Sequence, residues 1–460
     1  MNFTQDHQQA FAQLSGDYNP MHVDTIAARR TPFGQVVVHG MHLVFVLLED
    51  LAQQGKLPPL AAIEAHFSQP VFIQDPVRVA PMVQEGERLK LQLVDDGGPR
   101  MSLWITPGDH GSDPLPHAPA HVSMPQQPLF NQCKDQTGSV PLPVDQPQLQ
   151  ALFPALGVYH DPQALAVLLG LTQLVGMVCP GLHSLFSGFK LQRQAQATHS
   201  TQLRYRVKRA SSPRAPIKME VEGGVMQGAV QAFFRPPPVE QPSAQAMVER
   251  YGHQAYVGTH ALVLGGARGL GEVAAKLIAA GGGQVTITYA HGQEDAQRVA
   301  QEITQAGGCC DLLKWDVCHP PQDLNPHYSH LYYFATPPIG RGVAHGLVDA
   351  QRLAYFEQFY VHGFLQTLER LVRTDGEPLQ VFYPSTIYVT DVPKGLVEYA
   401  MAKGAGEALC HYLNQHDKRF HIQLPRLPKL HTDQNMSLLG PAPQPPLEVI
   451  QPWVATMHGL

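Results

Sequence analysis

Cysteine is scarce in this sequence, and long apolar runs are absent from it. Six cysteines occur in 460 residues, and none of them belongs to a CxxC pair. A disulfide framework or a zinc site needs closer or more regular spacing, so we expect reduced thiols. No run of about 18 apolar residues occurs, and the N-terminus has no basic start followed by an apolar core. We therefore expect no membrane partner, no secretory signal and a cytoplasmic location.

Charged side chains are also few. They make up 15% of the residues, the formal net charge is -6 at pH 7, and lysine and arginine are spread along the chain. Nucleic acids and anionic membranes bind clustered cations, so neither is expected as a partner. The 24 histidines are scattered and form no HExxH pattern. The sequence therefore predicts no metal site.

The sequence is long and rich in apolar residues. The chain exceeds what one hydrophobic core organises, and its length suggests about three domains. Hydrophobic residues make up 44% of it, which is typical of a soluble globular protein. Proline-rich stretches at 107–147 and 235–243 interrupt the hydrophobic periodicity. They divide the chain into three predicted domains, at residues 1–110, 145–240 and 255–460.

The first segment combines one apolar helix with several strand-like runs. Residues 40–55, GMHLVFVLLEDLAQQG, are apolar on nearly every face and predict a buried helix. The runs AAIEAHFSQPVFI, VRVAPMV, RLKLQLV and MSLWITP follow it. Their order predicts a curved antiparallel sheet around the helix.

The second segment repeats this plan faintly. His160-Asp161 and the later PGLHSLFSGF echo the sequences HVD and HGMHLVFVLL of the first segment, and LRYRVKR and MEVEGGVMQGAVQAFF predict strands. Chance similarity between apolar segments is the alternative explanation. The repeat is thus a hypothesis that two similar units follow each other in the chain.

The sharpest motif of the first segment is SGDYNPMHVD, which brings Asp17 and His22 together in one turn. A carboxylate and an imidazole placed in this way can hold one water. They can remove an α-proton from a thioester and protonate the departing hydroxyl group, or run both steps backwards. A backbone N–H near Gly40, at the start of the helix, can stabilise the enolate oxygen. The alternative is that Asp17 caps a turn and His22 is an ordinary polar residue; for His39 and His42 we favour structural roles.

Together, SGDYNPMHVD, FGQVVVHGM and HFSQPVFIQD resemble the MaoC-like, (R)-specific enoyl-CoA hydratase/dehydratase family of hotdog folds. The resemblance implies that Asp17 and His22 are the catalytic pair and that Gly40 contributes the oxyanion contact. It implies an acyl-CoA or acyl carrier protein thioester as the substrate. It also implies that two hotdog units pair, which a degenerate second unit at 145–240 would satisfy within one chain while shaping the acyl tunnel. One hydratase site per chain is then expected.

The third segment alternates strands and helices, which predicts βαβ units in a parallel doubly wound sheet. HALVLGGARGLGEVAAKLI is a strand, a glycine-rich turn and a helix, in which Gly265, Gly269 and Gly271 allow close approach of a pyrophosphate. Farther on, Tyr399 and Lys403 in YAMAK share one helical face. The ammonium can then lower the pKa of the phenol for proton transfer to a carbonyl oxygen.

These motifs, with the strand VFYPSTIYV, resemble the short-chain dehydrogenase/reductase family over about residues 258–430. The resemblance implies that Tyr399 is the general acid, that Lys403 tunes it and binds the ribose, and that Ser385 or Thr386 anchors the carbonyl; the sequence leaves these two open. It also implies an adenine contact at Asp316, and Leu270 belongs with the glycines to the cofactor turn. No acidic residue ends QVTITYAHG, and Arg268 is available for a 2'-phosphate, so NADP(H) is favoured over NAD(H).

Two departures from the reductase pattern bear on catalysis. The family's Asn-Ala-Gly after the fourth strand is replaced by ATPPIG around Thr336, and its helix asparagine is replaced by Tyr360 or His362. Cofactor binding tolerates these changes more easily than hydride transfer does. A domain that binds nucleotide without reducing a substrate is therefore a competing expectation.

The expected fold class is multidomain, α+β and α/β, with an N-terminal double hotdog fold followed by a Rossmann-type doubly wound parallel sheet. The leading functional hypothesis is a bifunctional enzyme. Its C-terminal domain reduces a 3-oxoacyl thioester with NADPH, and its N-terminal site dehydrates the (R)-3-hydroxy product to a 2-enoyl thioester. The alternatives are a dehydratase with a degenerate reductase domain, or a non-enzymatic thioester-binding scaffold of a synthase. The resemblances allow a homodimer.

Overall fold

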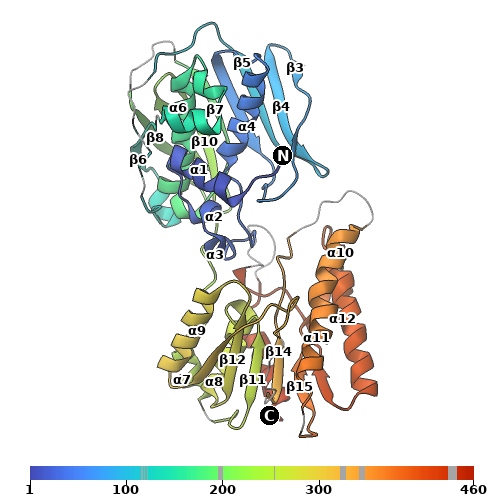
Figure 1. The fold of residues 1–460 in the computed structure, drawn as a ribbon. Coiled ribbons are helices and arrows are strands. Elements are labelled where there is room, and N and C mark those ends of the chain that lie inside the picture. Colours follow the sequence, from blue (N-terminus) through green and yellow to red (C-terminus); the bar gives the residue numbers. More distant parts are fainter. Residues whose placement is uncertain are drawn as a thin grey trace. The chain divides into compact units, whose positions relative to one another are not determined.

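The chain forms two compact units in a computed structural model, residues 1–237 and 238–460 (Figure 1). The structure describes residues 1–114, 118, 120, 121, 123–143, 145–194, 200–252, 254–321, 328–340, 348–373, 375–433 and 443–460. The boundary expected between residues 110 and 145 falls inside the first unit, and the division of that unit into two domains stays a prediction. No helix in the described part of the chain is both long enough and apolar enough to span a membrane.

The first unit is built on a ten-stranded antiparallel sheet within the described residues. The strands follow the order β2-β4-β5-β1-β7-β10-β9-β8-β6, and β3 pairs with β4. At the centre, β1 and β7 pair antiparallel and join the two halves of the unit. The strand bounds are β1 Leu60–Phe67, β2 Arg78–Val79, β3 Val83–Glu85, β4 Arg88–Asp95, β5 Gly98–Pro107, β6 Thr137–Pro141, β7 Ser184–Arg193, β8 Gln202–Arg209, β9 Ile217–Gly223 and β10 Met226–Phe234.

Two apolar helices pack on this sheet, one from each half. Helix α4, Gly40–Gln53, contacts β4 and β5, and α6, Pro162–Gln173, contacts β6, β8 and β10. Burial of their apolar side chains in one core supplies the main driving force for this packing. The shorter helices are α1 Gln5–Ser15, α2 Pro20–Val23, α3 Thr25–Ala28 and α5 Gln146–Leu152, with single turns η1 Phe130–Cys133, η2 Leu156–Val158 and η4 Gly181–His183.

One part of the predicted repeat between the two halves is wrong. The segment LHSLFSGF was compared with the first buried helix, but most of it lies in strand β7. The buried helix of the second half is α6, which begins directly after Asp161 and continues as the π-helix η3, Leu174–Val178. An apolar segment that is buried on both sides looks the same in sequence whether it is helix or strand, which explains the error.

The second unit is a parallel sheet of six strands in the described residues, in the order β13-β12-β11-β14-β15-β17. Numbered along the sheet this is 3-2-1-4-5-6, the order of a doubly wound Rossmann-type fold, as expected. The strands are β11 His260–Leu264, β12 Gln284–Tyr289, β13 Cys309–Lys314, β14 His330–Tyr333, β15 Leu379–Phe382 and β17 Phe420–Gln423, with a small separate pair, β16 Ser385–Thr386 and β18 Arg426–Leu427.

Helices cover both faces of this sheet (Figure 1). Apolar cores lie on both sides, one that includes α8 and one that includes α11 and α12. In such a sheet ligands bind at the carboxyl ends of the strands, beside the point where the strand order reverses, here between β11 and β14. The helices are α7 Ala244–Tyr251, α8 Gly269–Ala280, α9 Gln293–Gln305, α10 Ala350–Glu357, π-helix η5 Gln358–His362, α11 Gly363–Arg370, α12 Val397–His416 and α13 Pro446–Met457, with the turn η6 Ile387–Val389.

Candidate active sites

The loop that bears Asp17 and His22 is held in place by Asn19. Helix α1 ends at Gly16, whose φ of 75° reverses the chain into the loop. The Asn19 side chain accepts a hydrogen bond from the Met21 backbone and caps α2. Its Nδ2 donates to the Gly176 carbonyl at 3.0 Å, in the second half of the unit. The loop geometry therefore depends on residues more than 150 positions away along the chain.

The carboxylate of Asp17 is buried and held by two hydrogen bonds. It accepts from the Thr172 hydroxyl at 2.6 Å and from the Asn19 backbone N–H at 3.1 Å. Gly176 lies against it, and a Cβ at this position would overlap the carboxylate. Burial raises the pKa of Asp17, against the opposing effects of His22 and of the two hydrogen bonds. The site thus favours a protonated carboxyl group more than water does.

His22 is oriented as a base. Its Nδ1 lies 2.7 Å from the Val37 carbonyl oxygen, which can only accept a hydrogen bond, so Nδ1 carries a proton. In the neutral ring Nε2 then has a free lone pair. Burial lowers the pKa of His22, and Asp17 opposes this effect. Burial thus disfavours the charged form of both groups and brings their proton affinities closer together.

His39, to which we gave a structural role, lies inside this site. It precedes α4, its Nε2 is 3.0 Å from the Asp17 backbone oxygen, and its Nδ1 is 2.9 Å from Oε1 of Gln8. Its ring stacks on His22 with centroids 4.0 Å apart. The ligand atoms of these two histidines and Asp17 lie within 4.8 Å of one another, but both ring nitrogens of His39 are already hydrogen bonded. Its position directly before Gly40 is the sequence feature that could have identified His39 as a residue of this site.

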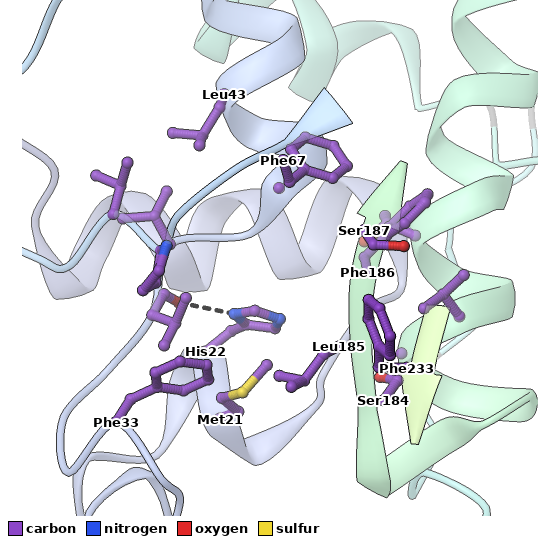
Figure 2. A pocket seen from close by; sticks show the side chains of 18 of the residues that line it. Met21, His22, Phe33, Leu43, Phe67, Ser184, Leu185, Phe186, Ser187 and Phe233 are labelled. Atoms are coloured by element: carbon purple, nitrogen blue, oxygen red, sulfur yellow. Dashed lines mark hydrogen bonds between the residues drawn. The ribbon is translucent and has the colours of Figure 1, made fainter. Parts of the chain in front are cut away.

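A pocket of about 230 Å³ opens on the pair and is walled by both halves of the unit. Figure 2 shows His22 with its hydrogen bond on one side and the phenyl rings of Phe67, Phe186 and Phe233 on the other. Gly40 lines the pocket as the first residue of α4, where a backbone N–H has no acceptor within the helix. The ring of Phe67 would lie 3.1 Å from a Cβ at residue 40. The structure therefore brings the three predicted hydratase residues to one largely apolar pocket.

In the second unit the glycine-rich turn joins β11 to α8 as expected. Gly265 and Gly269 have φ values of 78° and 57°, which favour glycine. Gly271 lies in the first turn of α8, and a Cβ there would overlap the Gly265 carbonyl oxygen. Arg268 is the N-cap residue of α8, and Leu270 packs against the core. The turn leaves backbone N–H groups at a helix N-terminus, the arrangement that binds phosphate.

Asp316 lies just after β13 in the same unit. Its carboxylate accepts from the Cys318 backbone N–H and lies 3.0 Å from Nδ1 of His319. Burial raises its pKa, but these two partners outweigh burial and hold the pKa below its ordinary value. The adenine contact assigned to this residue stays a prediction.

Thr386, and not Ser385, is the hydroxyl residue beside Tyr399. The Thr386 side chain lies close enough to Tyr399 to lower the pKa of its phenol, whereas the Ser385 hydroxyl donates to the Glu407 carboxylate at 2.5 Å. Burial raises the pKa of Tyr399, with the Thr386 side chain opposing it. Burial also lowers the pKa of the Lys403 ammonium to about 7. The position of Thr386 therefore favours it as the carbonyl anchor, and the choice between the two residues stays a prediction.

The surroundings of Lys403 differ from a simple Tyr-Lys pair. Its Nζ donates to the Pro384 carbonyl at 2.7 Å and lies 4.1 Å from the centre of the Tyr360 ring. Tyr360 is buried in η5, and its hydroxyl is 2.5 Å from the Thr336 hydroxyl. His362 is exposed. Tyr360 is therefore the residue that faces the site, and a cation–π contact holds the ammonium.

Known proteins resemble the N-terminal part of the chain. Residues 1–96 match the family model described as MaoC like domain. The (R)-specific enoyl-CoA hydratase of Aeromonas caviae is 41% identical over 70 residues, 15% of this chain and 52% of that protein. The mitochondrial 3-hydroxyacyl-[acyl-carrier-protein] dehydratase of Arabidopsis thaliana is 29% identical over 75 residues, 16% and 45% of the two chains. The N-terminal part is thus a MaoC-like domain, although the chain spans only about half the length of these curated relatives.

Solved structures resemble part of the chain more distantly. A short chain dehydrogenase from Salmonella enterica matches at 17% identity and a TM-score of 0.40, covering 45% of this chain and 92% of that one. A 3-oxoacyl (acyl-carrier-protein) reductase from Agrobacterium tumefaciens with NADP bound matches at 16% identity and a TM-score of 0.38, covering 44% and 88%. The Rossmann-type fold of the second unit is inferred from its own strand order and not from these matches.

Proposed function

We propose that the first unit interconverts (R)-3-hydroxyacyl and 2-enoyl thioesters by removing or adding water. The observation that supports this most directly is the meeting of the Asp17 carboxylate, the His22 ring and the Gly40 backbone in one apolar pocket. Two inferences accompany the proposal. The sheet with its two buried helices is a double hotdog fold, and the second half serves as the wall of the acyl tunnel, because it contributes Phe186 and Phe233 to the pocket.

In the proposed dehydration, His22 is the base and Asp17 is the acid. Nε2 of His22 takes the α-proton of the 3-hydroxyacyl thioester, and the electron pair of that C–H bond forms the double bond. The protonated carboxyl group of Asp17 gives its proton to the departing hydroxyl group, which leaves as water. The Gly40 N–H holds the thioester oxygen while negative charge develops on it. Hydration uses the same groups in reverse, starting from ionised Asp17 and protonated His22.

The test is hydration of 2-enoyl thioesters by the purified full-length chain. Loss of ultraviolet absorbance reports addition of water, and chiral analysis of the product reports its configuration. We expect the (R)-3-hydroxyacyl product. Parallel assays with coenzyme A and acyl carrier protein thioesters of several acyl lengths identify the carrier. No turnover with any of them would leave the thioester-binding scaffold as the better hypothesis.

We also propose that the second unit is an NADP(H)-dependent reductase of 3-oxoacyl thioesters. The residues fit a dinucleotide. A Cβ at Gly265 or Gly271 would crowd the turn, Gly269 has a positive φ, and no carboxylate ends β12 to repel a 2'-phosphate. The bound nicotinamide would supply hydride. Thr386 would orient the substrate carbonyl, and the Tyr399 phenol would donate a proton to its oxygen. The buried Lys403 ammonium would favour the phenolate that remains.

The corresponding experiment mixes the chain with NADPH and a 3-oxoacyl thioester, follows cofactor fluorescence and reads the products by mass spectrometry. Coupled reduction and dehydration predict loss of NADPH and appearance of an enoyl thioester. NADPH binding without its oxidation, together with active hydration, would instead support the second candidate, a dehydratase with a silent nucleotide-binding unit. The replacement of the helix asparagine by Tyr360 is the observation that favours this candidate. Measuring the mass of the protein in solution tests whether it forms the expected homodimer.

A further inference from the structure

A buried arginine lies close to the catalytic loop of the first unit. Arg235 follows β10 and is only 3% exposed. Its Nη2 donates to the Leu182 carbonyl at 2.7 Å, while Nε and Nη1 are buried without a hydrogen-bond partner. Within the residues that the structure describes, no carboxylate pairs with it. Burial lowers the pKa of the guanidinium to about 10, so it is still charged at neutral pH.

Two contacts place this charge beside the catalytic loop. The Arg235 backbone N–H donates to the His183 carbonyl at 2.8 Å and extends the pairing of β10 with β7. The Leu182 carbonyl that binds Arg235 also accepts from Nδ2 of Asn19 at 3.3 Å. Arg235 and the catalytic loop are therefore joined through one backbone oxygen.

An unpaired buried cation costs free energy, and removing a charge from such a place often stabilises a protein. Hydrophobic residues of similar volume would fill this position as well. We therefore expect the buried charge to have a role other than stabilising the fold. Since the proposed reaction develops negative charge, a fixed buried cation near the catalytic loop has such a role.

We propose that Arg235 is a positioning residue of the hydratase site, whose bond to the Leu182 carbonyl fixes the catalytic loop and whose buried charge acts on the catalytic pair. This inference rests on the proposed hydratase function. The charged and titratable groups that face His22 are Asp17 from the loop, His39 from the start of α4 and Arg235 from the end of β10. Burial lowers the pKa of His22 most, Asp17 raises it, and Arg235 lowers it further.

Two measurements on Arg235→Met and Arg235→Lys test the proposal. The first follows the His22 ring signal by carbon-13 NMR during a pH titration, with His22→Gln to assign the signal. We expect His22 to titrate about one pH unit higher in Arg235→Met than in the natural chain. Arg235→Lys keeps the charge and should titrate close to the natural chain. The second measurement is the pH profile of enoyl thioester hydration, whose limb due to His22 should move in the same direction.

The matched control is Arg204→Met, which removes an exposed arginine of β8 that pairs with Glu222. Neither the His22 titration nor the pH profile should change in it. An unchanged His22 titration in Arg235→Met, with activity merely reduced, would overturn the inference and leave the hydratase function standing. If the natural chain hydrates no thioester, the proposed function fails. The NMR titration then still decides whether Arg235 acts on His22, because it does not require turnover.

Discussion

The Thr172 hydroxyl donates a hydrogen bond of 2.6 Å to the Asp17 carboxylate, although 155 residues separate them in the chain. Thr172 belongs to α6, the buried helix of the second half, while Asp17 belongs to the loop of the first. The second half has no sequence of its own like GDYNPMH, yet it completes the site of the first. Its contribution is to hold the carboxylate and wall the pocket.

Replacing Thr172 with valine should weaken hydration without unfolding the unit. Valine keeps the volume but removes the donor, so the carboxylate loses one of its two hydrogen bonds and its fixed orientation. We expect kcat to fall about 10-fold, with a loss of about 1 kcal/mol in the free energy of unfolding. Steady-state kinetics and urea unfolding measure the two effects. Thr304→Val is the matched control, since that hydroxyl bonds only a helix carbonyl of the second unit; equal losses in both variants would contradict the prediction.

Asp17→Asn should abolish hydration while leaving NADPH binding intact. An amide cannot deliver or take up the proton that the reaction moves, and general acid–base groups contribute about 100- to 10,000-fold. We expect kcat/KM for hydration to fall within that range, and the affinity for NADPH, measured by fluorescence, to stay unchanged. A variant that hydrates at the natural rate would assign the pocket a different role.

Substitutions in the second unit should distinguish its two neighbouring hydroxyl residues. Tyr399→Phe and Thr386→Val remove the phenol and its partner, so both should reduce NADPH oxidation at least about 100-fold. Ser385→Ala should reduce it much less, because that hydroxyl is bonded to Glu407 and not to Tyr399. Hydration by the first unit is the internal control. The opposite order of Ser385→Ala and Thr386→Val would show that the carbonyl anchor is Ser385.

Acid should destabilise the first unit through His42. Its ring is buried against Phe11, with centroids 4.7 Å apart, and burial lowers its pKa from 6.5 to about 3. Below pH 6.5 the unfolded chain therefore binds a proton that the folded chain excludes, and stability is lost as the pH falls toward 3. The loss from this group at pH 5 is about 2 kcal/mol.

Hydrogen exchange of peptides from α4 measures this effect in the first unit alone. His42→Phe keeps the ring packing and removes the titrating group, so its opening free energy should depend less on pH between 7 and 5. His66→Phe, an exposed histidine of β1, should leave the dependence as it is. The same slope in all three proteins would show that His42 does not cause the acid sensitivity.

Much of the molecule was predictable because its patterns are local. SGDYNPMHVD predicted the loop of Asp17 and His22, and VVHGM followed by apolar residues predicted the helix that begins at Gly40. The glycines after HALVL predicted a tight turn between a strand and a helix, and Gly265 and Gly269 of that turn have left-handed conformations that favour glycine. The alternation of strands and helices after residue 255 predicted the doubly wound sheet, because parallel strands require crossover connections.

What only the tertiary structure decided are the contacts between distant segments. These contacts leave no periodic trace in the sequence: Thr172 and Gly176 around Asp17, the stacking of His39 on His22, the bond of Ser385 to Glu407 and the burial of Arg235. The comparison of LHSLFSGF with a helix was wrong, because burial on all sides hides the difference between helix and strand. Local sequence determined which groups the site contains. Their hydrogen bonds, protonation and dielectric surroundings depend on which remote side chains the fold packs against them.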